Sequence, residues 1–319
     1  MQAKLLAGVV PALLGLSIQS SLGQSSSPKL VPRMQVIPQA HDQVSFQRDG
    51  IELTRYHFAT NLNRPFLFPV NGPGGRSVTR MGHPHDPTGH SHHNSIWFSH
   101  HDVDGVSFWE DKGKGRVLHR RILSFDDGEE SASLVALNAW TTEDSTVLMN
   151  ERRRITARSL PEGEWLLAID VELNAARGQV RLGKTPFGLL GLRMAKTIGV
   201  NDGGGMIRNS AGAVNEKEVF WKPARWVDYS GPITPTATEG IALLDHPKNP
   251  NHPSTFHVRN DGWMGASFTF SDARVIKRDE PLTLRYGFYV HRGLNVTHAI
   301  ESRWEEFSRT SPAPFPVVK

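Results

Sequence analysis

The chain has 319 residues, 38% of them hydrophobic, which is enough apolar material for a sizeable core. Its formal net charge is +4, and acidic and basic residues are interspersed without a basic stripe, so we expect no nucleic-acid partner. It contains no cysteine, which excludes disulfides and thiolate chemistry. A metal site would therefore need histidine and carboxylate ligands.

The chain begins with features of a cleaved signal peptide. Lys4 precedes an apolar run from Leu5 to Ile18, and Ser21 and Gly23 are small residues suited to a cleavage site. The run is shorter than the roughly 20 residues of a membrane span. We therefore predict a signal peptide at residues 1–23 and a secreted or periplasmic protein with no membrane span in the mature chain, the alternative being a retained N-terminal anchor.

The remaining sequence indicates an all-β fold. Short segments rich in β-branched and aromatic residues alternate with Gly, Pro, Asn and Asp turns, and there is no βαβ rhythm. We predict an antiparallel β-sandwich as one domain at residues 45–310, preceded by a flexible lead-in at 24–44 and carrying one clear helix at Asn295–Ser308. The expected strands are Ile51–Thr60, Arg116–Ser124, Ala132–Thr141, Thr146–Ala157, Glu164–Leu173, Val219–Asp228, Gly240–Leu244, Gly262–Phe270 and Leu282–His291.

Histidines are concentrated in one short segment. Seven of the fifteen lie between His83 and His101, in a stretch broken by Pro84, Pro87 and Gly89 that reads as a loop before strand character resumes at Ser95. Imidazole titrates near neutral pH and binds metals well, so this density predicts a functional site. Loops held by Pro and Gly on a sheet scaffold are where such sites usually lie.

Three interpretations of the segment stay open. In the first, histidines and a carboxylate act as general acid and base; His83 and His85 would share one side of an extended chain, beside Asp86, whereas His92 and His93 would point in opposite directions. In the second, His-x-His supplies two ligands of a divalent metal. In the third, the histidines only cap turns and bond to the backbone.

Other residues could complete such a site. Asp102, Asp104 and Glu110 follow the segment and could orient or ionise a histidine, while Trp97 and Trp109 could stack on a sugar ring or lie in the core. A second proline-fixed polar loop carries Asp245 and His246 and could close the site from the other side. Glu151 and Arg153 would share one face of a strand, which we expect to be solvated.

Several motifs together resemble a family of exported bacterial proteins of unknown function labelled "methane oxygenase PmoA-like". They include Asn63–Val70, Arg76–Arg80, the histidine segment, Asn201–Gly205 and Arg225–Gly231. The resemblance runs from about residue 45 to 295 and implies a carbohydrate role. The absence of long apolar segments after residue 23 argues against a membrane oxygenase.

A weaker, fold-level resemblance is to aldose epimerases. It implies a super-sandwich of the galactose mutarotase type, in which loop histidines and a carboxylate move protons on a sugar. We therefore expect an enzyme acting by acid-base chemistry on a sugar or oligosaccharide, without a cofactor. The alternatives are a non-catalytic sugar-binding protein and a metal enzyme with histidine ligands. The catalytic candidates are His83, His85, His93, Asp86 and Asp104, and the substrate-binding candidates are Arg80, His92, Trp97, Asp245 and His246.

Overall fold

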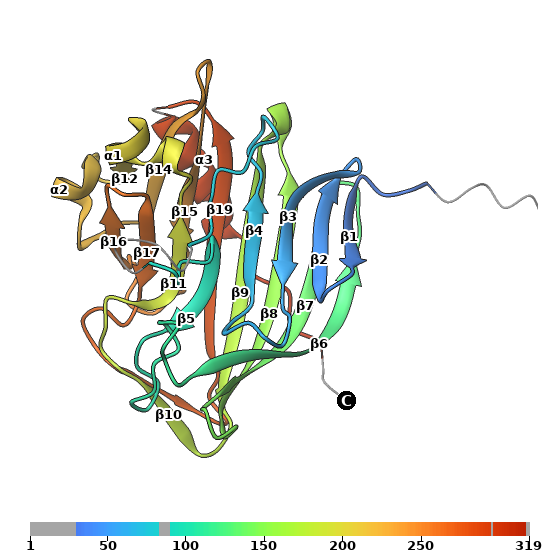
Figure 1. Ribbon diagram of the computed structural model, residues 1–319, viewed down its shortest axis with the longest axis vertical. Coiled ribbons are helices and arrows are strands. Elements are labelled where there is room, and N and C mark those ends of the chain that lie inside the picture. The colour runs from blue at the N-terminus through green and yellow to red at the C-terminus, as the bar shows by residue number, and fades with distance from the viewer. Residues whose placement is uncertain (1–29, 83–89, 295, 317–319) are drawn as a thin grey trace, which may run out of the picture. The chain divides into compact units, whose positions relative to one another are not determined.

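Two antiparallel sheets packed face to face form the fold in the computed structural model (Figure 1), which describes residues 30–82, 90–294 and 296–316. The chain divides after Val31, and the strands and helices of the described residues belong to the unit from Pro32 to Lys319. The predicted signal peptide, residues 1–23, lies outside the described residues and stays a prediction.

The first sheet has nine strands. Their order across the sheet is β1 (Met34–Gln39), β2 (Gln43–Arg48), β3 (Ile51–His57), β4 (Phe66–Val70), β5 (Ile96–His100), β11 (Gly188–Arg193), β17 (Trp263–Ser267), β16 (Thr255–Arg259) and β13 (Lys222–Pro223).

The second sheet has eight strands and lies behind the first (Figure 1). Its order is β12 (Met206–Asn209), β14 (Trp226–Thr234), β15 (Ala237–Asp245), β19 (Leu282–Arg292), β9 (Trp165–Ala175), β8 (Val147–Ser159), β7 (Ser131–Thr141) and β6 (Arg116–Asp126). A separate pair joins β10 (Gln179–Leu182) to β18 (Arg274–Lys277).

Helices are few and short in the described part of the chain. They are α1 (Val200–Gly203), α2 (Asn215–Val219) and α3 (Thr297–Arg309), with 3-10 turns at Pro161–Gly163 and Lys196–Ile198. The longest of them, α3, packs Ile300 and Phe307 against Trp226 and Leu244, on the face of the second sheet that turns away from the core. None of these helices has the length and apolar character needed to cross a bilayer.

The all-β prediction is confirmed, and most of the expected strands form near their expected bounds. Two expectations differ. Met34–Gln39, inside the predicted lead-in, forms β1 because it pairs with β2 and buries Met34 and Val36. The expected strand Val219–Asp228 is broken: α2 ends at Val219, Pro223 lies in the two-residue edge strand β13, and only the part from Trp226 enters the second sheet.

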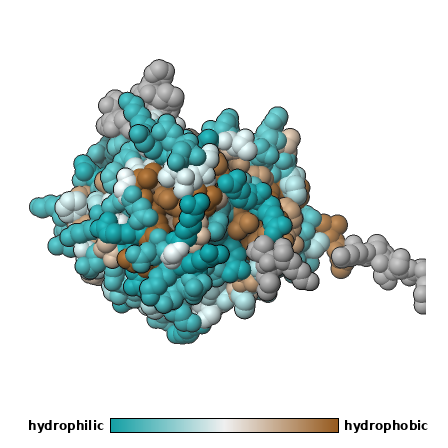
Figure 2. Space-filling view, turned by 90° about the horizontal axis from the view of Figure 1, so that it is seen from below, coloured by the Kyte–Doolittle hydropathy of each residue, from teal (hydrophilic) through white to brown (hydrophobic). Residues whose placement is uncertain are grey.

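The side chains of β9 alternate between two faces, and each face packs into a different hydrophobic layer. Trp165, Leu167 and Ile169 point into the core between the sheets, whereas Leu166 and Ala168 face the layer under α3. Both faces of this strand are therefore buried. The outer surface is mostly hydrophilic on the face shown in Figure 2, with hydrophobic residues gathered near its middle.

Glu151 and Arg153 share a face of β8, as expected, but that face is buried rather than solvated. Glu151 is 0% exposed and forms an ion pair with Arg153 at 2.6 Å. Its carboxylate also accepts hydrogen bonds from the Asn138 amide (2.9 Å) and the Trp140 indole N–H (2.7 Å). The alternation along the strand is as predicted. The face is buried because the first sheet packs over it: the Arg153 guanidinium lies 5.2 Å from the Phe98 ring of β5.

A second buried pair joins His291 of β19 to Asp228 of β14. The His291 ring is fully buried, and its Nε2 lies 2.9 Å from an Asp228 carboxylate oxygen. Burial alone would lower the pKa of His291, but the attraction and hydrogen bond of Asp228 outweigh it and raise the pKa above its ordinary value.

This pair makes stability depend on pH. A proton held more tightly in the folded chain stabilises the fold fully below the unfolded pKa, and that contribution is lost as the pH rises through the folded pKa. We expect the difference in unfolding free energy between wild type and His291→Gln to be larger at about pH 5.5, below the ordinary histidine pKa of about 6.5, than at about pH 9. Urea unfolding at the two pH values measures it, and a constant difference would contradict the assignment.

Candidate functional site

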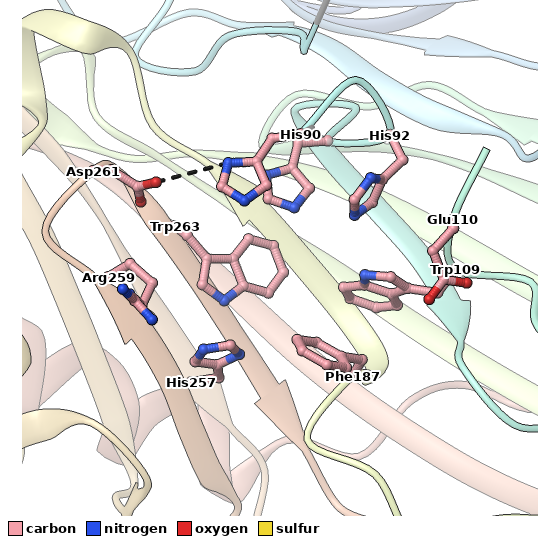
Figure 3. Close-up of a pocket in the computed structure, with 10 residues that line it drawn as sticks. His90, His92, Trp109, Glu110, Phe187, His257, Arg259, Asp261 and Trp263 are labelled. Carbon is pink, nitrogen blue, oxygen red and sulfur yellow. Dashed lines mark ion pairs between the residues drawn. The ribbon is translucent and has the colours of Figure 1, made fainter. Parts of the chain in front are cut away.

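A cavity of about 470 Å³ lies beside the histidine segment, on the face of the first sheet that turns away from the core. Trp97 and Trp263 belong to a hydrophobic cluster on this face, whereas their neighbours Ile96 and Met264 belong to the core between the sheets. Figure 3 shows the lining residues, which are His90, His92, His93, Trp109, Glu110, Phe187, His257, Arg259, Asp261 and Trp263.

Two glycines create the space for the aromatic floor. One row of paired residues crosses four neighbouring strands of the sheet. It consists of Trp97 on β5, Gly191 on β11, Gly265 on β17 and His257 on β16. A Cβ atom on Gly191 would lie 2.5 Å from the Trp97 ring and 2.9 Å from the Trp263 ring. Because glycine has no side chain, the two indoles can cover the backbone of the central strand.

His93 is packed into this floor. It is 5% exposed, and its ring stacks on Trp97 and Trp263, with ring centroids 5.2 and 4.9 Å away. Burial is the main cause that lowers the pKa of His93 far below its ordinary value, and the neighbouring His92, Arg193, His90 and Arg80 act in the same direction. His93 is therefore neutral at neutral pH, and its ring forms part of the floor.

One wall of the cavity carries His90 and Asp261. The His90 Nδ1 lies 3.8 Å from the Asp261 carboxylate, the pair marked in Figure 3. Asp261 also receives two hydrogen bonds, of 2.9 and 3.2 Å, from the buried guanidinium of Arg193 on β11. This fork fixes the carboxylate while leaving it about one-third exposed toward the cavity.

The opposite wall carries Glu110 (Figure 3). Its carboxylate accepts a hydrogen bond from the Ser107 hydroxyl and lies 2.8 Å from the His101 ring nitrogen. Burial works to raise the pKa of Glu110, but the hydrogen bonds from Ser107 and its own backbone and the interactions with His101 outweigh it, so the pKa lies below its ordinary value. Glu110 is consequently ionised at neutral pH.

Two other imidazoles of the lining, those of His92 and His257, are uncharged at neutral pH. Burial is the main cause that lowers the pKa of His92, helped by the charge of Arg64, and burial likewise lowers the pKa of His257 to about 4. A neutral imidazole offers one N–H donor and one acceptor nitrogen. The cavity thus combines neutral proton carriers with one carboxylate on each side.

Arg64, just before β4, holds two segments of the site together. It is 1% exposed, and burial lowers its pKa to about 10, so it stays protonated at neutral pH. Its guanidinium donates hydrogen bonds to the backbone carbonyls of Phe108 (3.2 Å), Trp109 (2.7 Å) and His92 (3.1 Å) and to the Asn94 side chain (2.9 Å). The segment of His92 is thereby tied to that of Trp109 and Glu110.

The predicted site residues fall into three groups: those outside the described residues, those at the cavity and those elsewhere in the fold. His83, His85 and Asp86 lie outside the described residues. His92 and His93 line the cavity, Trp97 lies beneath it at 1% exposure, and Arg80 is close enough to influence the pKa of His93. Asp104 does not reach the cavity: its carboxylate accepts a hydrogen bond from the Arg181 backbone at 2.9 Å and holds a turn.

Asp245 and His246 are also absent from the cavity lining, which corrects the expectation that their loop closes the site. Asp245 ends β15 in the other sheet, where its carboxylate bonds to Asn249 and His252. The His246 Nε2 lies 3.0 Å from the Thr310 carbonyl, and its ring packs against Phe307 of α3. These residues fix the loop that leads from β15 to β16.

The sequence reasoning missed the wall formed by β16 and β17. His257 and Arg259 stand two residues apart on β16, a spacing that places both side chains on one face of the strand. Trp263 stands opposite Arg259 on β17, and Asp261 lies in the turn between the two strands. The spacing within β16 could have pointed to His257 and Arg259. Phe187 carries no comparable signal, since it reaches the cavity through the segment before β11.

Among the described residues, no group of three or more histidines and carboxylates has the arrangement of a metal site. His90, His92 and His93 lie close together, but His93 stacks flat against His90, with ring centroids 4.5 Å apart and ring planes 10° apart. Stacked rings direct their nitrogen lone pairs side by side rather than toward a common point. These three described histidines therefore do not fit a shared metal ion.

The chain belongs to a family of unknown function, DUF6807, whose model matches residues 43–305. The match covers the whole sandwich from β2 onward and both walls of the cavity. The description of the family names no methane oxygenase. No curated protein matches the chain.

Twenty-three solved chains are similar to this one. One of them is described as a candidate kojibiose phosphorylase from human microbiome, with 10% sequence identity and a TM-score of 0.35. The similarity covers 88% of this chain but 37% of that one, so this chain spans little more than a third of the length of the protein it matches.

Proposed function

We propose that the cavity binds a sugar and catalyses proton transfer on it, with Glu110 as the general base. The observation that carries this proposal is the placement of an ionised carboxylate and neutral imidazoles around an aromatic floor. A sugar ring has an apolar C–H face and a rim of hydroxyl groups, so it needs both kinds of surface at once.

The floor supplies the apolar contact. Trp109 and Trp263 meet edge to face at 5.7 Å, and Phe187 lies 5.7 Å from Trp109. The rim supplies hydrogen bonds: Arg259 donates, Asp261 accepts, and His90 and His92 can do either. A cavity of about 470 Å³ falls within the range of about 300–1,000 Å³ typical of small-molecule sites.

Acid-base chemistry on a sugar needs two groups with different proton affinities on different sides of the ring. Glu110, held ionised by Ser107 and His101, can accept a proton from a hydroxyl or an acidic C–H group. Across the cavity, His90 beside Asp261 can donate a hydrogen bond to an oxygen on which negative charge develops. Such chemistry includes ring opening, epimerisation and elimination.

Replacing Glu110 by Gln tests the proposal. The panel is glucose, galactose, mannose, xylose and glucuronic acid with their homo-disaccharides, with turnover followed by proton NMR and binding by calorimetry. Because the amide keeps the shape but cannot take a proton, we expect turnover to fall by about a hundredfold or more while sugar affinity changes by less than about threefold.

Asp272→Asn is the matched control, since Asp272 is exposed and outside the cavity. Unchanged turnover in Glu110→Gln would overturn the role of Glu110. If the wild type binds sugars but converts none of them, the catalytic part of the proposal is overturned and the protein is a sugar-binding protein. If it binds none, the proposed function is overturned.

A further inference from the structure

An aromatic surface continues outward from the cavity beyond His257. Phe220 and Trp221 lie between α2 and β13, with their rings stacked at 4.5 Å, and the Phe270 ring lies 5.6 Å from Trp221. Of the eight tryptophans, all of them in described segments, only Trp221 is exposed, at 48%. We call Phe220, Trp221 and Phe270 the aromatic platform.

His257 joins the platform to the cavity. Its ring lies 5.3 Å from Phe187 inside the cavity, 5.1 Å from Phe220 and 6.4 Å from Trp221. Arg259, another lining residue, places its guanidinium 5.8 Å from the Phe220 ring. The aromatic surface is therefore continuous from the floor to the platform.

The backbone holds Trp221 in an unusual conformation. Its φ of +57° lies in the left-handed region, which is unfavourable for a bulky side chain. The Trp221 N–H donates a 2.9 Å hydrogen bond to the carbonyl of Phe256, the residue before His257. The strand that carries the cavity wall thus fixes the position of the exposed ring.

We infer that the substrate is an oligosaccharide, with one unit in the cavity and the next unit stacked on the aromatic platform. This inference rests on the proposed function. Exposed tryptophan faces beside charged side chains match the apolar face and hydroxyl rim of a sugar ring, and here the Arg259 guanidinium lies beside the Phe220 ring. Continuity with the cavity favours a glycan chain over a separate protein partner, because one linear molecule can occupy both surfaces.

Trp221→Ala tests the inference. Its affinity is measured for each monosaccharide and for the matching disaccharide, first glucose with its disaccharides and xylose with xylobiose, and then the other sugars of the panel. We expect the affinity for the disaccharide to fall about five- to twentyfold and that for the monosaccharide to change by less than about twofold. Trp221→Tyr keeps a stacking ring and should restore most of the affinity. Phe125→Ala removes an equally exposed aromatic ring on β6 and should change neither.

The outcomes separate the two proposals. Equal effects of Trp221→Ala on both sugar lengths, or no effect on either, would overturn the platform while leaving sugar binding in the cavity intact. The wild type could also self-associate, and Trp221→Ala could abolish this without changing the disaccharide affinity. That result would overturn the inference and assign the platform to contact with a second copy of the chain. A wild type that binds no sugar of either length overturns the proposed function, and this inference with it.

Discussion

Replacing Glu151 by Ala is expected to lower the free energy of unfolding by about 3–5 kcal/mol, because it leaves a buried guanidinium without its counter-charge. Arg153 is 3% exposed and depends on Glu151 for its ion pair, while the Trp140 indole N–H and the Asn138 amide would lose their acceptor. Urea unfolding followed by tryptophan fluorescence measures the change.

Glu280→Ala is a suitable control, since its ion pair with Lys277 is exposed on both sides and should contribute less than about 1 kcal/mol. Glu151→Gln keeps an acceptor but removes the charge, so it should fall between wild type and Glu151→Ala. A loss below about 1 kcal/mol for Glu151→Ala would mean that Arg153 finds another partner, against the structure described above.

Arg64→Ala is expected to reduce both stability and sugar binding. Removing the guanidinium leaves the Trp109 and His92 carbonyls and the Asn94 side chain without this donor, while the Phe108 carbonyl keeps the Ser99 hydroxyl, at a cost of about 3 kcal/mol. The segments of His92 and Trp109 would also lose their common anchor, so sugar affinity should fall about tenfold or more.

The two effects of Arg64→Ala can be measured separately by urea unfolding and by calorimetry with the sugars bound by the wild type. Arg76→Ala, at an exposed position in the loop that follows β4, should leave both quantities unchanged. Lost stability with unchanged sugar affinity in Arg64→Ala would show that Arg64 supports the fold without shaping the cavity.

The strands that the sequence predicts well are those whose pattern is local. β7 and β9 show the alternation of a sheet with defined inner faces, and α3 shows a helical pattern near its actual bounds. Val219–Asp228 was misjudged because aromatic residues favour a strand, whereas Pro223 and the left-handed Trp221 interrupt it. Which sheet a strand joins is not a local property. The sequence therefore places the loop at Asp245 beside the cavity, whereas Asp245 ends β15 in the second sheet.

For the candidate site, the sequence points to the histidine segment but not to its counterpart. His90, His92 and His93 do line the cavity, and the density of histidines drew attention to them. His257 and Trp263, which line the same cavity, come from strands more than 150 residues later, brought alongside through β11. No spacing within the histidine segment can reveal such a long-range pairing.

The central position of β11 has a consequence for how the protein is made. β5 pairs with β11, some 90 residues further along, and the strands between them in the chain build the other sheet or the small β10–β18 pair. Pairings this distant form slowly, because the loop entropy is lost before the contacts are gained. A nascent chain that has emerged only as far as residue 200 would carry the whole cluster of histidines and still have no cavity, since Trp263 would not yet exist to form its floor.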